Sequence, residues 1–415
     1  MSILIKNVIL ESKKKDIFIE GNKIEKIGEN LDLKADEKID AKGEKAVLPG
    51  FVNCHTHSAM TLFRGYADDF PLKEWLTKKI WPLEQKITKD DVYWGTKLAC
   101  SEMIKTGTTT FNEMYWYPEA QIEAVKEIGL RAMIGLVMID FLPIGSKENV
   151  EKLFVKLKAK NLETISLSIA PHSIYGVSKE NLIWAKDFAR KENLLLHIHL
   201  SETEEEVNGC LKLAKMRPVE YLEKIGFLNE NCILAHSIWL NEREIEILAK
   251  RKCSVVYNPC SNMKLASGIF PYKKLKEAGV NICLGTDGPA SNNSLDMFLE
   301  MKFASLLQKV KEMDPTMAPA KEIFEMATRN GAKALKINAG EIKEGKLADL
   351  ILIDLNQISL TPGHNLVSDI VYSANGNCVS DLICNGKILM RDRKIEGEEK
   401  IKKEATKRAK ELVKD

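Results

Sequence analysis

Short apolar runs alternate with amphipathic segments through the middle of the chain, from about residue 49 to residue 344. Apolar runs bounded by turn residues are typical of buried strands, and apolar positions three and four apart are typical of helices. Eight runs predict buried strands: 47–52, 108–112, 131–138, 165–170, 194–199, 232–236, 253–257 and 281–285. Helical segments with polar faces lie between most of them, such as 91–105, 179–191 and 241–250. This alternation predicts the α/β class and a TIM-like (β/α)8 barrel.

Both ends of the chain have a different pattern, in which short strands alternate with turns. The first 48 residues contain three such strands, and Asn385-Gly386 between two apolar runs near the other end is a strong hairpin signal. Neither end has enough apolar surface to fold alone. We therefore expect a small β-sandwich domain built from 1–48 and 345–415, with the barrel, 49–344, inserted. The last 20 or so residues predict an amphipathic helix with Ile401, Ala405, Ala409 and Leu412 on one face.

Composition excludes several classes of partner. The 61 basic and 59 acidic residues nearly cancel, at a net charge of +2, so neither nucleic acid nor a membrane surface is expected as a partner. No apolar run approaches the roughly 20 residues of a membrane span, and the first residues lack a signal-peptide pattern. The nine cysteines contain no Cys-x-x-Cys pair, which favours buried free thiols and a cytoplasmic location.

Polar side chains suited to metal chemistry gather at the ends of the predicted strands. His55 and His57 are two residues apart at the end of the first strand, so their imidazoles point to one face and converge as a metal requires. The other strand-end residues are His172, His199, Glu202, His236 and Asp287. In barrels, polar groups at the carboxyl ends of strands line the active-site mouth. The pattern predicts a mononuclear metal-dependent hydrolase.

The remaining residues near these positions have plainer interpretations. His197 shares a face with His199 but lies one layer deeper, where we expect a hydrogen-bonded interior residue. His364 lies outside any strand end and is expected in a loop. Cys54 points away from the histidine face and is expected to pack, and Glu204 to Glu206 are expected on the solvated face of a helix.

The residues around these positions resemble the amidohydrolase superfamily. The resemblance is closer to its branch of S-adenosylhomocysteine, 5′-methylthioadenosine and 5′-deoxyadenosine deaminases, and it covers nearly the whole chain. The matching segments are Pro-Gly-Phe-Val-Asn-Cys-His-Thr-His (49–57), Pro-His-Ser (171–173), His-Ile-His-Leu-Ser-Glu-Thr (197–203), Leu-Ala-His (234–236) and Gly-Thr-Asp-Gly-Pro-Ala-Ser-Asn-Asn (285–293).

This resemblance implies a ligand set and a mechanism. The implied metal ligands are His55, His57, His199 and Asp287, which suit one divalent ion, with Zn²⁺ expected. Strand 165–170 has no lysine that could be carboxylated to bridge a second metal, so one metal is expected. Such a metal lowers the pKa of its water to about 7.

The implied reaction is the hydrolytic removal of the 6-amino group of an adenosine-type nucleoside as ammonia, leaving the inosine analogue. Asp287 is expected to accept a proton from the attacking water, and Glu202 is expected to protonate the purine ring and then help ammonia leave. His236 is expected to hydrogen-bond the attacking oxygen and stabilise the tetrahedral intermediate.

The resemblance also implies substrate contacts. Glu84 is expected to accept hydrogen bonds from the ribose, His172 to lie near the ribose or its 5′ group, Trp75 to form an apolar wall, and Ser291 to touch the ligand. Relatives that favour S-adenosylhomocysteine usually place an arginine after the third strand, but 140–148 has none. Of the substrates 5′-deoxyadenosine, 5′-methylthioadenosine, S-adenosylhomocysteine and adenosine, we expect those with small uncharged 5′ groups to be preferred.

Two other functions remain open at this point. One is another mononuclear amidohydrolase, such as a guanine deaminase, a chlorohydrolase or an imidazolone hydrolase, because these share the His-x-His and Thr-Asp-Gly segments. The other is a metal-free scaffold, against which the four retained ligands argue. A homo-oligomer, either a dimer or a tetramer, is expected from the resemblance alone.

Overall fold

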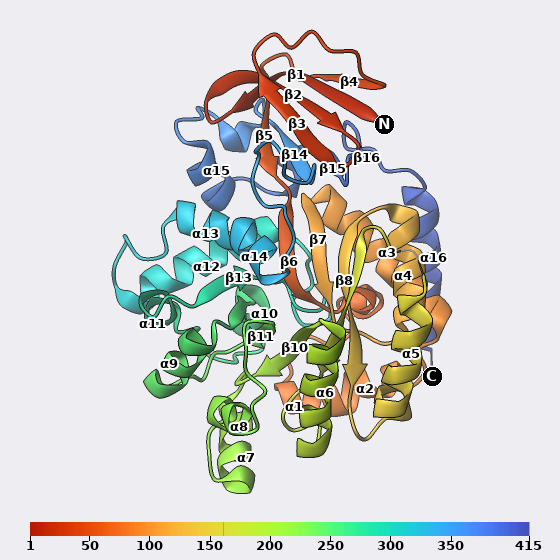
Figure 1. Cartoon of the computed structure of the whole chain (residues 1–415), viewed down its shortest axis with the longest axis vertical. Helices are drawn as coiled ribbons and strands as arrows, with labels where there is room; N and C mark the ends of the chain where they lie inside the picture. The colour runs from red at the N-terminus through yellow and green to blue at the C-terminus, as the bar shows by residue number, and fades with distance from the viewer. Residues whose placement is uncertain (161, 415) are drawn as a thin grey trace.

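Eight parallel strands surround the centre of the larger part of the chain (Figure 1). The computed structural model describes residues 1–160 and 162–414. The barrel strands, in ring order, are β6 (Phe51–Thr56), β7 (Thr108–Glu113), β8 (Arg131–Met138), β9 (Ile165–Pro171), β10 (Leu195–Leu200), β11 (Cys232–His236), β12 (Ser254–Tyr257) and β13 (Asn281–Leu284). At the remaining seam the amide of Asp287, just after β13, donates to the carbonyl of His55 in β6 at 2.9 Å. The carboxyl ends of all eight strands therefore meet at one mouth.

The first predicted strand, 47–52, is wrong as a single element. The run belongs to two strands in two sheets, β5 (Lys45–Pro49) in the sheet of the chain ends and β6 in the barrel. Gly50 separates them, and a Cβ there would lie 2.2 Å from the Thr109 side chain. Both strands are buried and apolar, so hydrophobicity alone cannot show that the chain changes sheets. The other seven predicted strands match to within one residue at each end.

The chain ends form a separate mixed sheet, which lies above the barrel in Figure 1. Its strands are β1 (Ser2–Leu10), β2 (Lys13–Glu20), β3 (Lys23–Gly28), β4 (Glu37–Asp40), β5, β14 (Leu350–Asp354), β15 (Val379–Cys384) and β16 (Lys387–Met390). β5 pairs with β14 in antiparallel fashion, which joins strands from the two ends. The predicted hairpin at Asn385-Gly386 connects β15 to β16. The two ends thus combine into one sheet, while the exact division at 48/49 and 344/345 stays a prediction.

A buried ion pair fastens the barrel to this sheet. Arg131 begins β8, and its Nε donates to Asp349 Oδ2 at 2.7 Å. Its Nη2 donates to Asp349 Oδ1 and to the side-chain oxygen of Asn385, Oδ1. The backbone amide of Asn385 donates to Asp349 Oδ1 as well. Every polar group in this cluster that faces Arg131 is an acceptor. The two parts of the chain are therefore held together by a charge pair with satisfied hydrogen bonds.

Helices cover the outside of the barrel (Figure 1). They are α1 (Leu72–Glu74), η2 (Trp75–Ile80), α2 (Trp81–Glu84), α3 (Lys89–Lys105), α4 (Pro118–Ile128), α5 (Lys147–Lys158), α6 (Lys179–Glu192), α7 (Glu204–Ala214), α8 (Pro218–Lys224), α9 (Glu242–Arg251), α10 (Pro259–Lys264), α11 (Tyr272–Glu277), α12 (Met297–Glu312), α13 (Ala320–Ala327), α14 (Arg329–Ala334), α15 (Leu366–Tyr372) and α16 (Glu398–Leu412). Short turns of tighter helix are η1 (Ser58–Phe63), η3 (Pro143–Gly145), η4 (Ile358–Leu360) and η5 (Gly376–Cys378).

The last helix confirms the predicted amphipathic pattern. α16 packs against α3 and buries Ile401, Ala405 and Leu412. Arg408 on the same helix pairs with Asp90 and Asp91 at the start of α3. The C-terminal segment thus leaves the terminal sheet and returns along the side of the barrel (Figure 1).

The helices and the cysteines bear on two expectations drawn from composition. Within residues 1–160 and 162–414, no helix combines the length and the apolar character needed to cross a membrane. All nine cysteines are free thiols, and eight of them are buried.

Candidate metal centre and active site

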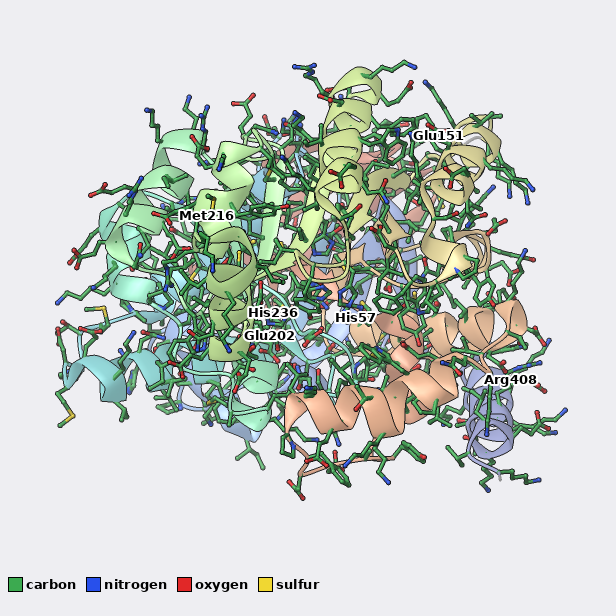
Figure 2. The ribbon with its side chains drawn as sticks, turned by 90° about the horizontal axis from the view of Figure 1, so that it is seen from below. His57, Glu151, Glu202, Met216, His236 and Arg408 are labelled. Atoms are coloured by element: carbon green, nitrogen blue, oxygen red, sulfur yellow. The ribbon has the colours of Figure 1, made fainter. Side chains whose placement is uncertain are left out.

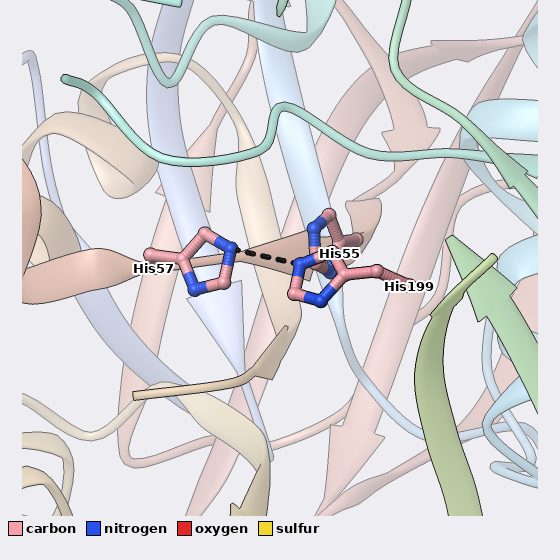
Figure 3. Close-up of side chains that lie close together, drawn as sticks. All are labelled: His55, His57 and His199. Atoms are coloured by element: carbon pink, nitrogen blue, oxygen red, sulfur yellow. Dashed lines mark hydrogen bonds between the residues drawn. The ribbon is translucent and has the colours of Figure 1, made fainter. Parts of the chain in front are cut away.

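Three imidazoles and one carboxylate converge at the mouth of the barrel. Figure 3 shows the rings of His55, His57 and His199 facing one another, with 3.3 Å between His57 Nε2 and His199 Nε2. Asp287 Oδ1 lies 3.3 Å from His55 Nε2 and 3.2 Å from His57 Nε2. Their ligand atoms come from the ends of β6, β10 and β13, which the barrel topology brings together. The structure therefore assembles the four residues predicted as metal ligands in one place.

The far side of each ring fixes which nitrogen is free to bind a metal. His57 Nδ1 lies 2.5 Å from the Met114 carbonyl, and His199 Nδ1 lies 2.7 Å from the His172 carbonyl. Because a carbonyl only accepts, Nδ1 donates a hydrogen bond in both rings, which leaves Nε2 as the nitrogen that faces the cluster and could bind a metal. The Nε2 of His55 is buried without a hydrogen-bond partner among the described residues. This donor set, with three nitrogens and a carboxylate oxygen, fits a divalent metal.

The charges within the cluster favour the same conclusion. Burial alone would raise the pKa of Asp287, but His55 and His57 hold it well below its usual range. Burial lowers the pKa of His55 to about 3. Burial also opposes the charged form of His57, but Asp287 outweighs this effect and raises the pKa of His57 to about 9. Asp287 is thus an anion at neutral pH, and a proton on His57 competes with a metal for the same position.

Two serines hold the other oxygen of Asp287. Ser261 Oγ donates to Asp287 Oδ2 at 2.6 Å, and Ser291 Oγ donates to the same oxygen at 3.1 Å. Ser291 was predicted to touch the ligand; it lines the cavity described below and also orients Asp287. Sequence reasoning missed Ser261. The available signal was its place in the polar run that directly follows β12, at the carboxyl end of a barrel strand.

Glu202 and His236 lie beside this cluster. Figure 2, seen from below, shows His57, His236 and Glu202 together near the centre of the molecule. His236 Nε2 is 3.7 Å from Glu202 Oε2, and burial raises the pKa of Glu202. The side chains of Asn258 and Asn262 lie 3.3 and 2.9 Å from His236 Nδ1. These two asparagines, which the sequence did not single out, turn the Nε2 of His236 toward the site.

The backbone turns sharply at three of these strand ends. Ser201, His236 and Asp287 all adopt the left-handed conformation, with φ of 49°, 70° and 61°. Such a conformation costs a residue other than glycine about 1–3 kcal/mol and persists where surrounding contacts enforce it. The strain ends each strand abruptly and redirects its last side chains across the mouth.

A cavity of about 570 Å³ opens from the cluster, and its lining contains all five residues predicted to contact the substrate. Glu84, His172, Trp75 and Ser291 all line it, as do Glu202, His236 and Asp287. Trp75 is 6% exposed, and its indole N–H donates to the Ala67 carbonyl at 3.0 Å. Burial raises the pKa of Glu84 to about 7. The cavity size is ordinary for a small-molecule site.

The predictions for His197 and His364 are confirmed, whereas the prediction for Glu204 to Glu206 is wrong in part. His197 is fully buried and lies between His55 Nδ1 (3.0 Å) and Asn112 Nδ2 (3.1 Å), as an interior residue should. His364 is exposed in a loop. The solvated interpretation is wrong for Glu206, which is half-buried and accepts two backbone hydrogen bonds, whereas Glu204 and Glu205 are exposed as expected. A run of consecutive charged residues in the sequence does not show which of their side chains points into the protein.

The chain matches a known protein family over most of its length. The amidohydrolase family model matches residues 46–389, and the chain belongs to that family. It is 50% identical over 401 residues to a 5-methylthioadenosine/S-adenosylhomocysteine deaminase of Thermococcus sibiricus, covering 94% of each chain. It is 47% identical over 422 residues to a 5′-deoxyadenosine deaminase of Methanoregula boonei, covering 99% of this chain and 95% of that one.

A solved structure is similar over nearly its full length. The crystal structure of an adenosine deaminase from Xanthomonas campestris with bound zinc superimposes with a TM-score of 0.94 at 33% identity. The match covers 99% of this chain and 98% of that one.

Proposed function

We propose that this protein is a metal-dependent deaminase of adenosine-type nucleosides, which releases the 6-amino group as ammonia. The observation that carries the proposal is the convergence of His55, His57, His199 and Asp287 beside Glu202 and His236, next to a cavity of about 570 Å³. Relatives at 46–50% identity over nearly the whole chain bear the names of such deaminases. Glu84 in the cavity wall offers a carboxylate for two ribose hydroxyls, which a guanine or triazine substrate lacks.

We propose that His55, His57, His199 and Asp287 hold a single Zn²⁺. The donor set of three imidazoles and one carboxylate suits this ion, and a relative of known structure contains it. When bound, the ion supplies a nucleophilic hydroxide at neutral pH by lowering the pKa of water. β9 contains no lysine, which supports one metal rather than two.

We assign the proton transfers to Asp287 and Glu202, and the stabilisation of the added oxygen to His236. Asp287 is an anion in the cluster and accepts a proton from the attacking water. Glu202, whose pKa burial raises above its usual value, donates a proton to the purine ring nitrogen. His236 lies 3.7 Å from Glu202 and hydrogen-bonds the oxygen that adds to the purine carbon. Asp287 then gives its proton to the departing amino group, which leaves as ammonia, while Glu202 accepts the proton of the added hydroxyl group.

The proposal is tested by ammonia release and the loss of adenosine absorbance near 265 nm with zinc-loaded protein. Turnover of 5′-deoxyadenosine or 5′-methylthioadenosine supports it. Turnover of guanine or a triazine alone, by protein that contains zinc, contradicts the nucleoside assignment and leaves the metal site intact.

We further propose that the preferred substrates have small, uncharged 5′ groups. The loop after β8 contributes Phe141, Leu142 and Ile144 to the cavity wall, and no lysine or arginine is among the described lining residues. Lys147, the nearest cation in that loop, lies instead over the Trp184 ring, 5.4 Å from its centroid. The carboxylate of S-adenosylhomocysteine would therefore enter this cavity without a cationic partner.

This preference is tested by measuring kcat/KM for 5′-deoxyadenosine, 5′-methylthioadenosine, adenosine and S-adenosylhomocysteine. We expect S-adenosylhomocysteine to have the lowest value. If it has the highest value by far, the preference is wrong.

The expected homo-oligomer and cytoplasmic location also remain proposals. Light scattering on the purified protein measures the assembly size, and a single-chain mass would contradict the dimer or tetramer.

A further inference from the structure

Glu206 is a half-buried carboxylate next to the active site that the mechanism above does not use. It lies in the first turn of α7, where its own amide donates to the side chain of the N-cap residue Thr203 at 3.2 Å. Its Oε1 accepts from the Ser201 amide and its Oε2 from the Glu202 amide, both at 2.9 Å. One carboxylate thus binds two consecutive amides of the turn that carries Glu202.

This contact differs from ordinary helix capping. In a capping box, a glutamate at the third helical position binds the amide of the N-cap residue. Glu206 occupies the third position of α7, but it reaches past Thr203 to the two amides before it. The interaction is therefore directed at the strand-to-helix turn rather than at the helix terminus.

The Glu202 side chain has few restraints of its own. Among the described residues, its nearest polar neighbours are Ser267 Oγ at 3.4 Å and His236 Nε2 at 3.7 Å. Its direction is consequently set by its backbone. That backbone begins at Ser201, which has a left-handed conformation and whose carbonyl accepts from the amides of Ile238 and Trp239, both at 3.0 Å. Glu206 restrains the same turn by accepting hydrogen bonds from the backbone amides of Ser201 and Glu202.

We propose that Glu206 is a positioning residue for Glu202: its carboxylate fixes the two amides of the turn and thereby aims the Glu202 carboxyl group at the reacting purine. This inference rests on the proposed function, in which Glu202 transfers protons. It assigns Glu206 no contact with substrate or metal.

The test is a double-mutant cycle of Glu202→Gln and Glu206→Gln, measured as kcat and KM for 5′-deoxyadenosine with zinc-loaded protein. Glutamine keeps the shape of Glu206 but turns an N–H group toward one of the two amides. Because a small misplacement of a catalytic group lowers rates by up to about 100-fold, we expect kcat of Glu206→Gln to fall roughly 10- to 100-fold with KM nearly unchanged. Glu205→Gln, on the exposed neighbour, is the matched control and should keep wild-type kcat.

The cycle separates positioning from a general structural role. If Glu206 acts through Glu202, adding Glu206→Gln to Glu202→Gln causes no further loss of kcat. An equal loss in both backgrounds, or wild-type kcat in Glu206→Gln, overturns the inference.

Zinc content and melting temperature are measured for every variant. If Glu206→Gln does not fold, Glu206→Asp replaces it in the cycle, since the shorter side chain keeps the carboxyl group but cannot reach both amides. Failure of the proposed function is recognised separately, because zinc-loaded wild type would then release no ammonia from 5′-deoxyadenosine, or Glu202→Gln alone would keep the wild-type kcat.

Discussion

Burial determines the charge of the carboxyl groups that face the substrate. Glu84 and Glu202 both line the cavity, and burial raises the pKa of each. In the proposed mechanism the two residues have different roles, since Glu202 donates a proton whereas Glu84 accepts hydrogen bonds from the ribose. At the residue scale, the proposed activity therefore depends on pH through both carboxyl groups, and substrate binding requires Glu84 to be ionised.

The pKa of about 7 for Glu84 predicts weaker substrate binding in acid. Because this pKa is raised, the protonated form becomes dominant as pH falls below 7, and the carboxyl group then loses part of its accepting capacity. We expect KM for 5′-deoxyadenosine to rise several-fold between pH 8 and pH 6. The measurement is a pH profile of kcat/KM, with Glu84→Gln as the comparison. If kcat/KM of Glu84→Gln falls in acid in the same way as that of the wild type, the decrease is caused by another titratable group.

The sequence revealed the residues whose chemical type is rare and whose position is at a strand end. His55, His57, His199 and Asp287 are among the strand-end residues that the alternation of strands and helices places at one mouth, and the family resemblance implied that these four are the metal ligands. Ser261, Asn258 and Asn262 could not be predicted, since serine and asparagine are common after strands and their partners are distant in sequence. Glu206 was misassigned for a related reason: its partners are backbone amides, which leave no trace in a side-chain pattern.

At the element scale, the proposed metal centre depends on the seam between β13 and β6. The amide of Asp287 donates to the His55 carbonyl across this seam, and Asn53 Nδ2 donates to Thr286 Oγ1 at 2.7 Å. Gly285 lies between the two strands. A Cβ on Gly285 would be 2.5 Å from Asn258 Oδ1 and 2.9 Å from the His55 amide nitrogen. The absence of a side chain at this position is what lets two ligand-bearing strand ends approach each other.

Gly285→Ala is therefore expected to disturb the metal site. The added methyl group must displace β6 or Asn258, which we expect to cost about 1–3 kcal/mol of stability and to lower zinc occupancy. Elemental analysis and thermal melting measure both effects. Gly209→Ala in α7 is the matched control, because nothing lies within 4 Å of its added Cβ and alanine favours a helix. Equal zinc content in Gly285→Ala and wild type would contradict this role of the seam.

Element types were more predictable than the sheets to which the strands belong. Seven barrel strands follow from apolar runs of strand length, and the α16 face follows from its helical spacing. The division of 47–52 between two sheets was not predictable, because the residues on both sides of Gly50, Val47–Pro49 and Phe51–Val52, are apolar and buried. Pairing partners such as β14 decide this division, and they lie about 300 residues away.

For the whole molecule, the buried contact of Arg131 with Asp349 and Asn385 joins the barrel to the terminal sheet. Arg131 stands at the amino end of β8, which is the end of the barrel opposite the active-site mouth. Changes at this contact should therefore alter stability without altering the chemistry.

Asp349→Ala tests this separation. The substitution leaves the Arg131 guanidinium buried without its anion, for which we expect a loss of about 3–5 kcal/mol of stability. Well below the melting temperature, kcat and KM should match the wild type. Glu37→Ala is the control, since its ion pair with Arg391 also links the two chain ends but is exposed and should contribute less than about 1 kcal/mol. Similar urea midpoints for the two variants would rule out a special role for the buried pair.

The most direct test of the account is the rate of ammonia release from 5′-deoxyadenosine by zinc-loaded protein, measured beside Glu202→Gln. We predict rapid turnover by the wild type and a loss of at least about 100-fold in kcat for Glu202→Gln, with zinc content unchanged. Zinc-containing wild type that releases no ammonia from any adenosine derivative, or Glu202→Gln with wild-type kcat, would contradict the proposed deaminase mechanism.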